Sequence, residues 1–151
     1  MSSIKNASKI KNKESIGRLA SCIYRYSLIH IGNELKPYNI GSGQFNFLMA
    51  LYHKDGINQE SLAQSLRLDK ATTARAITKL MKKGYVTRQK DDLDQRACKI
   101  FLTEKAKKME PMIKKILSEW TETLLSGFTE DERKLFIDFL KRTVQNAGFV
   151  K

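Results

Sequence analysis

Residues 57–103 read INQESLAQSLRLDKATTARAITKLMKKGYVTRQKDDLDQRACKIFLT, and this stretch decides the fold. Asn58 is a good helix cap and predicts a short helix that continues to Leu66. Residues 67–69 predict a tight bend, and a second helix runs from Lys70 to about Lys83, where Gly84 ends it. Residues 86–90 and 98–102 predict two strands around the charged loop 91–96. This order is a helix-turn-helix followed by a hairpin wing.

Long helices flank this stretch on both sides. Residues 14–36 carry apolar side chains at spacings of three and four, with more on other faces, and Pro37 ends the predicted helix. A second long helix is predicted from Thr103 to about Ser126, and Pro111 inside it either kinks or splits it. Residues 129–132 have the form of a capping box and predict a final helix.

The predicted fold class is therefore mainly α with a small β-hairpin wing. A winged helix-turn-helix occupies residues 38–102, with the helix-turn-helix at about 58–83 and the wing at 86–102. Residues 14–36 and 103–147 form a helical dimerisation region, because the small module cannot bury these long apolar helices alone. Residues 1–13 are predicted to be a flexible basic arm.

The charge balance indicates an anionic partner. The chain has 28 Lys and Arg against 16 acids, which gives a formal charge of +12 and a pI near 9.8. Such a balance favours nucleic acid or an acidic membrane surface. No apolar stretch approaches the ~18 residues of a membrane span, and no apolar core follows the basic N-terminus as in a secretory signal. Cys22 and Cys98 lie far apart, which predicts reduced thiols and a cytoplasmic protein.

The second helix of the motif is predicted to have two distinct faces. Thr73, Ile77 and Leu80 should face the core, and the opposite side carries cations and short hydroxyls. Arg75 is predicted to bond a guanine edge or clamp a phosphate. Lys70 and Lys79 are better placed as phosphate contacts. The alternative is an ordinary solvated basic face.

The wing adds a second group of cations. Arg88 and Lys90 leave the first strand, and Arg96 sits near the second, around a loop tip rich in aspartate. We expect Asp94 to bond Arg96 and to hold its guanidinium toward the minor groove, where the negative potential is enhanced. The alternative is a generic acidic hairpin turn.

These residues carry a resemblance to the MarR family of bacterial and archaeal transcriptional regulators. It extends over about residues 14–147, and the Asp94-Gln95-Arg96 wing followed by a strand ending in Leu102-Thr103 is its most specific part. The resemblance implies a two-fold homodimer on a pseudo-palindromic operator. The positions that match the family's DNA contacts are Lys70, Thr72, Arg75, Lys79, Asp94 and Arg96. Ala71 and Ala74 stand where many members carry Ser, so some hydroxyl contacts are missing; the resemblance therefore implies the mode of binding but not the operator sequence.

The resemblance also implies an effector, a small phenolic or aromatic acid. Arg25 lies in an apolar segment and, if buried, needs an anionic partner, with Tyr24, Tyr38 or His30 nearby. The alternatives are that Arg25 pairs with a protein acid or reaches solvent, and that His30 is an ordinary core residue.

The predicted function is a sequence-specific DNA-binding transcriptional regulator, a repressor released by such an acid. Catalysis and cofactors are not expected, because the sequence has no glycine-rich phosphate loop and only two His and two Cys, scattered singly. One alternative is a winged-helix protein-interaction module without DNA readout. Another is a thiol-based redox-sensing regulator that uses Cys22.

Overall fold

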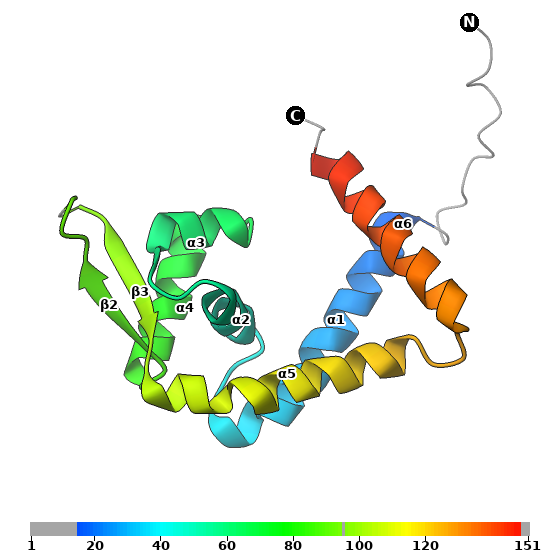
Figure 1. Ribbon diagram of the computed structural model, residues 1–151, viewed down its shortest axis with the longest axis horizontal. Coiled ribbons are helices and arrows are strands. Elements are labelled where there is room, and N and C mark those ends of the chain that lie inside the picture. Colours follow the sequence, from blue (N-terminus) through cyan, green and yellow to red (C-terminus); the bar gives the residue numbers. More distant parts are fainter. Residues whose placement is uncertain (1–14, 95, 149–151) are drawn as a thin grey trace, which may run out of the picture. The chain divides into compact units, whose positions relative to one another are not determined.

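The computed structural model describes residues 15–94 and 96–148, so the basic arm predicted at residues 1–13 lies outside the described residues. The described chain is mainly helical with a small antiparallel sheet, and the predicted fold class is confirmed (Figure 1). The elements in order are α1 (Ile16–Leu35), η2 (Lys36–Tyr38), α2 (Phe45–His53), β1 (Ile57–Asn58), α3 (Gln59–Ser65), α4 (Lys70–Lys82), β2 (Val86–Lys90), β3 (Cys98–Leu102), α5 (Glu104–Leu124) and α6 (Glu130–Gly148). The described residues form two compact units, which divide between Ile116 and Leu117.

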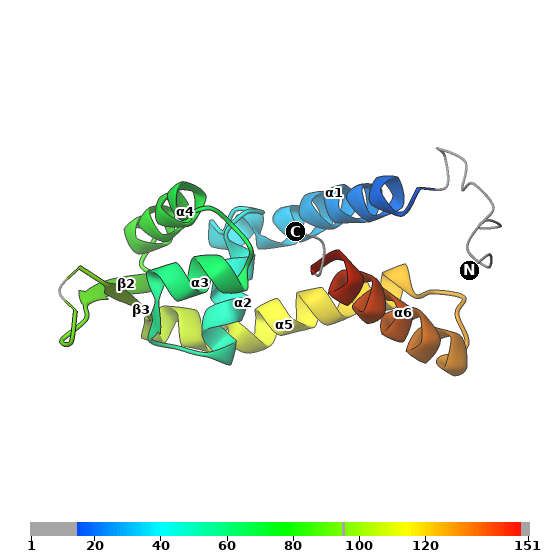
Figure 2. The same ribbon diagram turned by 90° about the horizontal axis from the view of Figure 1, so that it is seen from above.

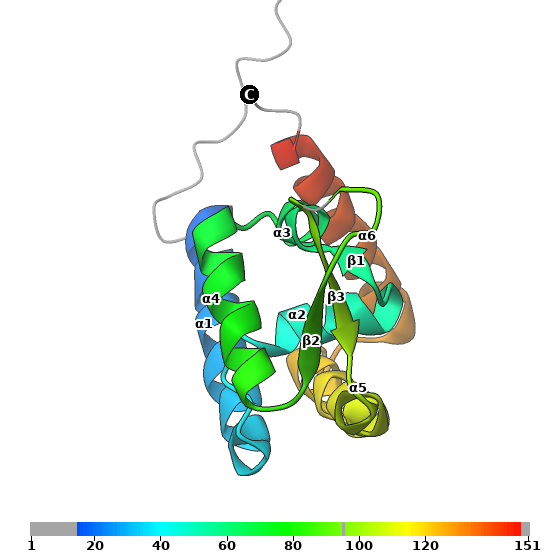
Figure 3. The same cartoon turned by 90° about the vertical axis from the view of Figure 1, so that its left-hand side faces the viewer.

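The first unit is organised around a three-stranded sheet of order β1-β3-β2. In the hairpin Val86 pairs with Leu102, and β1 joins the other edge of β3 with Ile57 opposite Ile100. The helix α2 packs against β3, and α4 runs alongside β2 (Figure 3). The core between them consists of fully buried side chains, among them Phe47, Leu48, Leu51, Leu62, Ile77, Leu80, Tyr85 and Ile100.

The predicted boundaries of the motif match the structure closely. Both hairpin strands have the predicted bounds, and α4 ends one residue before the predicted limit of Lys83. Gly84 has a φ of 78°, a left-handed conformation that favours glycine and turns the chain from α4 into β2. The strand β1 was missed, because two residues are too few to show an alternating pattern. The helix α5 runs through Pro111 without a break, so Pro111 does not split it.

Two tyrosine hydroxyls, of the half-buried Tyr52 and the buried Tyr85, connect elements of the first unit. Tyr52 donates a hydrogen bond of 2.6 Å to the carbonyl oxygen of Ala106 on α5. Burial, and then the negative charge of Glu110, raise the pKa of Tyr52 to about 12, so its phenol remains protonated and able to donate. Tyr85 likewise donates to the carbonyl oxygen of Tyr38. The first bond joins α2 to α5. The second joins Tyr85, which directly precedes β2, to the end of η2.

The second unit consists of the end of α5 and the helix α6. The predicted capping box is confirmed: the Thr129 N–H donates to Glu132 Oε2 at 2.8 Å, and the Glu132 N–H donates to Thr129 Oγ1 at 3.2 Å. Arg133 forms an ion pair with Glu122 at 2.6 Å. No residue of α6 is buried, and several of its large apolar side chains are exposed.

Among the described residues, no helix combines the length and the hydropathy needed to cross a membrane.

Gly56, at the turn before β1, gives a test of this packing. Its φ is 69°, and an added Cβ would lie 2.8 Å from Cε1 of Phe101. We therefore expect Gly56→Ala to lower the free energy of unfolding by about 1–3 kcal/mol, because strain and steric overlap add. Urea denaturation followed by circular dichroism measures it.

Gly43→Ala is the matched control, since an added Cβ at Gly43 meets nothing within 4 Å and the φ of Gly43 is not positive. This variant should be neutral or slightly stabilised. Equal losses in the two variants would contradict the described turn.

Candidate nucleic-acid interface

The two helices of the motif are held by side-chain caps and by one left-handed residue. Asn58 Oδ1 accepts hydrogen bonds from the N–H groups of Glu60 and Ser61 at the start of α3. Arg67 adopts a φ of 54°, which ends α3 and directs the chain into α4. Asp69 caps α4 by accepting from the Thr72 N–H at 2.7 Å. Figure 2 shows α3 and α4 next to the hairpin that they support.

The helix α4 has the two faces predicted from its sequence. Thr73, Ala76, Ile77 and Leu80 are buried against the rest of the unit. The opposite side carries the exposed side chains of Lys70, Arg75, Lys79 and Lys82, with Thr72 half-buried at its edge. An apolar face of this kind fixes the rotation of the helix, so the cations face solvent.

Asp69, Thr72 and Arg75 are linked by hydrogen bonds at the start of α4. The Thr72 hydroxyl donates to Asp69 Oδ2 at 2.6 Å, and Arg75 Nη2 donates to the same Thr72 oxygen at 3.3 Å. The bonds from the Thr72 side chain and backbone lower the pKa of Asp69, and the charge of Arg75 adds to this effect. Asp69 was predicted only as part of the bend, although Asp directly before a helix is a recognised capping signal.

Lys70 is paired across the motif with Glu60 of α3. The Nζ to Oε1 distance is 2.9 Å, and both side chains are largely exposed. An exposed pair of this kind contributes little to stability, so Lys70 remains available to another anion. Glu60 was not among the predicted site residues, since its role depends on the approach of two helices.

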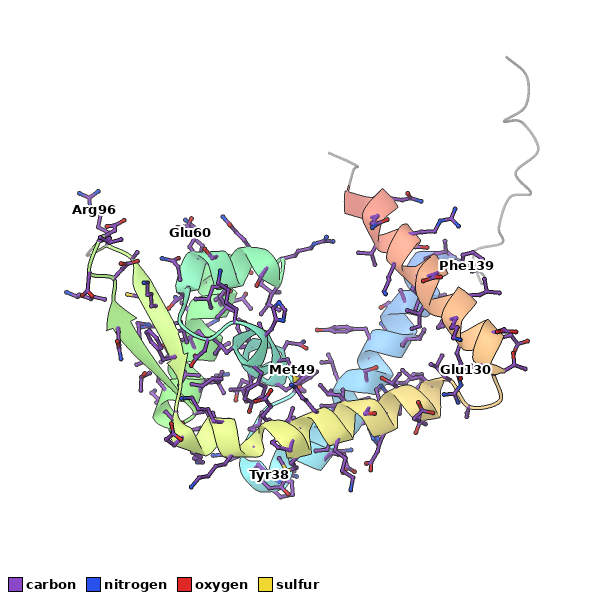
Figure 4. The ribbon with its side chains drawn as sticks, viewed as in Figure 1. Tyr38, Met49, Glu60, Arg96, Glu130 and Phe139 are labelled. Carbon is purple, nitrogen blue, oxygen red and sulfur yellow. The ribbon has the colours of Figure 1, made fainter. Side chains whose placement is uncertain are left out.

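The wing carries its acids in turns. Asp94 Oδ1 accepts from the backbone N–H of Arg96 at 3.0 Å, and Asp91 Oδ1 accepts from the backbone N–H of Leu93 at 3.0 Å. The expected bond from Asp94 to the Arg96 guanidinium is therefore corrected: the carboxylate shapes the backbone of the turn instead. The Arg96 side chain is exposed and points outward from the end of the wing (Figure 4).

A polar cavity of about 330 Å³ lies between α3, the start of α4 and the wing. Its lining includes Asn58, Gln59, Lys70, Thr73, Arg88 and Arg96, together with Cys98. In the part of the chain that the structure describes, Gln59 Oε1, Thr73 Oγ1 and Arg88 Nε are buried without a hydrogen-bond partner. Thr73 Oγ1 and Arg88 Nε are donors without a partner, and Gln59 Oε1 is an acceptor without one. Lys70 and Arg96 line the cavity together with the acids Glu60 and Asp94, so its chemistry suits water or an anionic oxygen held by the donors.

The predicted effector residues are placed differently from the expectation. Arg25 is exposed rather than buried, and its Nη2 donates to Cys22 Sγ at 3.6 Å. Tyr24 and Tyr38 are also exposed, and His30 is half-buried. Of the alternatives left open by the sequence, the structure therefore shows the one in which Arg25 reaches solvent. The apolar neighbours of Arg25 in sequence face solvent too, because α1 buries only Ile31 and Leu35.

Comparison with known proteins agrees with this geometry. Residues 40–98 match the model of the MarR family. The chain is 35% identical to the HTH-type transcriptional regulator YybA of Bacillus subtilis (strain 168), over 87% of this chain and 85% of that protein.

Two solved structures are also similar. A MarR transcriptional regulator from Methanosarcina mazei Go1 is 54% identical with a TM-score of 0.85, and the match covers 87% of this chain and 95% of that one. A MarR family transcriptional regulator from Listeria monocytogenes, complexed with 26mer DNA, is 32% identical with a TM-score of 0.75, over 87% of this chain and 85% of that one. The chain, with its winged helix-turn-helix and cationic α4, belongs to the MarR family of transcriptional regulators.

Proposed function

We propose that this protein binds a pseudo-palindromic operator as a homodimer in the cytoplasm, represses transcription, and is released by a small aromatic acid. The observation that carries the DNA-binding part is the exposed cationic face of α4, fixed beside a wing that ends in the exposed Arg96. The solved relative from Listeria monocytogenes is complexed with DNA, which supports the same mode of binding here.

The proposed docking uses each cation differently. The helix α4 enters the major groove, where Arg75 reads a base edge and Lys79 contacts a phosphate. Arg96 enters the adjacent minor groove. The phosphate strand between the two grooves passes the polar cavity, where Lys70 and Arg88 face it and Arg88 Nε gains a partner.

The homodimer is proposed from two exposed apolar surfaces, each considered by itself. On α1 the exposed apolar side chains include Ile16, Leu19, Ile23 and Ile29. On α6 they include Leu135, Phe139, Leu140 and Val144. Exposed apolar side chains gathered on one helix favour a protein interface, and a symmetric copy of the chain is the proposed partner.

The aromatic-acid effector is proposed at Arg25, with Tyr24, Tyr38 and His30 as the further candidate residues named from the sequence. Exposed Arg and Tyr side chains supply a cation for a carboxylate and rings for stacking. The thiol-based alternative rests on Cys22, which accepts a hydrogen bond from Arg25. Peroxide that weakens DNA binding of the wild type but not of Cys22→Ser would favour that alternative.

The DNA proposal predicts strong salt dependence. The logarithm of the affinity for duplexes selected from a randomised library should fall with the logarithm of salt concentration, at about −0.9 per phosphate contact. Lys79→Ala should make this slope shallower by about 0.9, the value of one phosphate contact. Fluorescence anisotropy at several salt concentrations measures it, with Lys134→Ala on α6 as the charge-matched control. An affinity that does not change with salt concentration would favour the alternative function, a winged-helix protein-interaction module without DNA readout.

The dimer proposal predicts a species of twice 17.3 kDa in analytical ultracentrifugation. Phe139→Asp combined with Leu135→Asp should shift the protein toward monomer and weaken DNA binding at least tenfold, since two linked half-sites gain from effective concentration. Lys141→Asp is the control for added charge on the same helix. A wild type that sediments as a monomer at micromolar concentration would contradict the dimer.

The effector proposal predicts that salicylate, used as the probe acid, weakens DNA binding of the wild type. Arg25→Ala should abolish this response and leave DNA affinity without salicylate unchanged, because Arg25 lies on α1 and not on the cationic face of α4. An undiminished salicylate response in Arg25→Ala would remove Arg25 from the effector site.

A further inference from the structure

We infer that Thr72 is a positioning residue, which acts on DNA readout through Arg75 and not by its own hydrogen bond to a base. This inference rests on the proposed function and adds a specificity-determining link to it. It starts from the three connected side chains at the beginning of α4: Asp69, Thr72 and Arg75.

The direction of each hydrogen bond is fixed by chemistry. A carboxylate only accepts, so the single proton of the Thr72 hydroxyl must point to Asp69 Oδ2, 2.6 Å away. Guanidinium only donates, so Arg75 Nη2 uses a lone pair of the same oxygen at 3.3 Å. Thr72 therefore presents no free O–H donor to a base, and its oxygen holds the Nη2 end of the Arg75 guanidinium.

Asp69 is itself held in place, which makes it a firm anchor. Its Oδ1 accepts from the Thr72 N–H at 2.7 Å as the cap of α4, while Oδ2 takes the hydroxyl. The lowered pKa of its carboxyl keeps both oxygens as acceptors at neutral pH. The anchor is thus part of the helix end, and α4 is fixed by its buried face.

The consequence concerns the remaining donors of Arg75. A guanidinium has five N–H groups, and the contact with Thr72 uses one of them, which leaves a pair free for the O6 and N7 atoms of guanine. An exposed arginine otherwise loses considerable rotamer freedom when it binds. Because Thr72 already holds the Arg75 guanidinium, less rotamer entropy is lost when Arg75 contacts guanine. Thr72 therefore affects base discrimination more than overall attraction to DNA.

Thr72→Val tests the inference, because it removes the hydroxyl and keeps the branched shape and the backbone cap. Thr72→Ser retains the hydroxyl as the conservative variant. The control is Thr123→Val, which removes an exposed helical hydroxyl that bonds the backbone of its own helix, α5. Circular dichroism first establishes that the melting temperatures agree.

Selection from a randomised duplex library, followed by anisotropy on the selected duplex and on its guanine-substituted versions, gives the readout. We expect Thr72→Val to lose about three- to tenfold of the guanine discrimination that Arg75→Ala abolishes, with an unchanged salt slope. Thr72→Ser and Thr123→Val should resemble the wild type. Thr72→Val should add nothing to Arg75→Ala, because the two residues act as one unit.

Three results would overturn the inference and leave DNA binding by the protein intact. The first is full guanine discrimination in Thr72→Val. The second is guanine discrimination that Arg75→Ala leaves unchanged, which would also remove Arg75 as the reader of that base. The third is that Thr72→Val causes the same loss of discrimination in the Arg75→Ala background as in the wild type, which would assign Thr72 a direct or purely structural role. A wild type that selects no sequence at all would overturn the proposed function together with this inference.

Discussion

The packing of one face of α4 against the sheet is the constraint on which the interface depends. Ile77 and Leu80 are fully buried, and Ala76 is nearly so. Each buried aliphatic side chain of this size contributes about 1.5–3 kcal/mol, well above any exposed ion pair in the chain. The rotation of α4 about its axis is therefore fixed by apolar burial. The cations on its other side therefore stay on the solvent-facing side of the helix, and no ion pair is needed to keep them there.

The polar contacts of the interface refine what this packing determines. Caps at Asn58 and Asp69 set where α3 and α4 begin, and the left-handed Arg67 sets the bend between them. Asp94 shapes the turn that carries Arg96. Asp69 and Asp94 thus accept hydrogen bonds from backbone or hydroxyl donors close to the exposed cations.

Local pattern was sufficient to predict much of this fold. The bounds of β2 and β3, the start of α4 and the Thr129–Glu132 capping box follow from short-range signals: alternation, capping residues and a glycine after the helix. Three features depended on contacts that no local pattern contains. The strand β1 forms by pairing with an edge of β3. Glu60 contacts Lys70 because α3 and the start of α4 lie close together. The exposure of Arg25 follows from how little of α1 the unit buries.

The helix α6 buries none of its residues in a single chain, although it spans Glu130–Gly148. In proteins most of the stability of a helix comes from packing of its apolar face rather than from helix propensity, so the order of α6 depends on whatever covers its apolar side chains. If that cover is a second copy, folding of the C-terminal segment and assembly become one concentration-dependent equilibrium. Below the protein concentration at which two copies associate, the C-terminal segment would be unfolded and open to proteases. Degradation in the cell would then set the lowest concentration at which the assembled regulator persists.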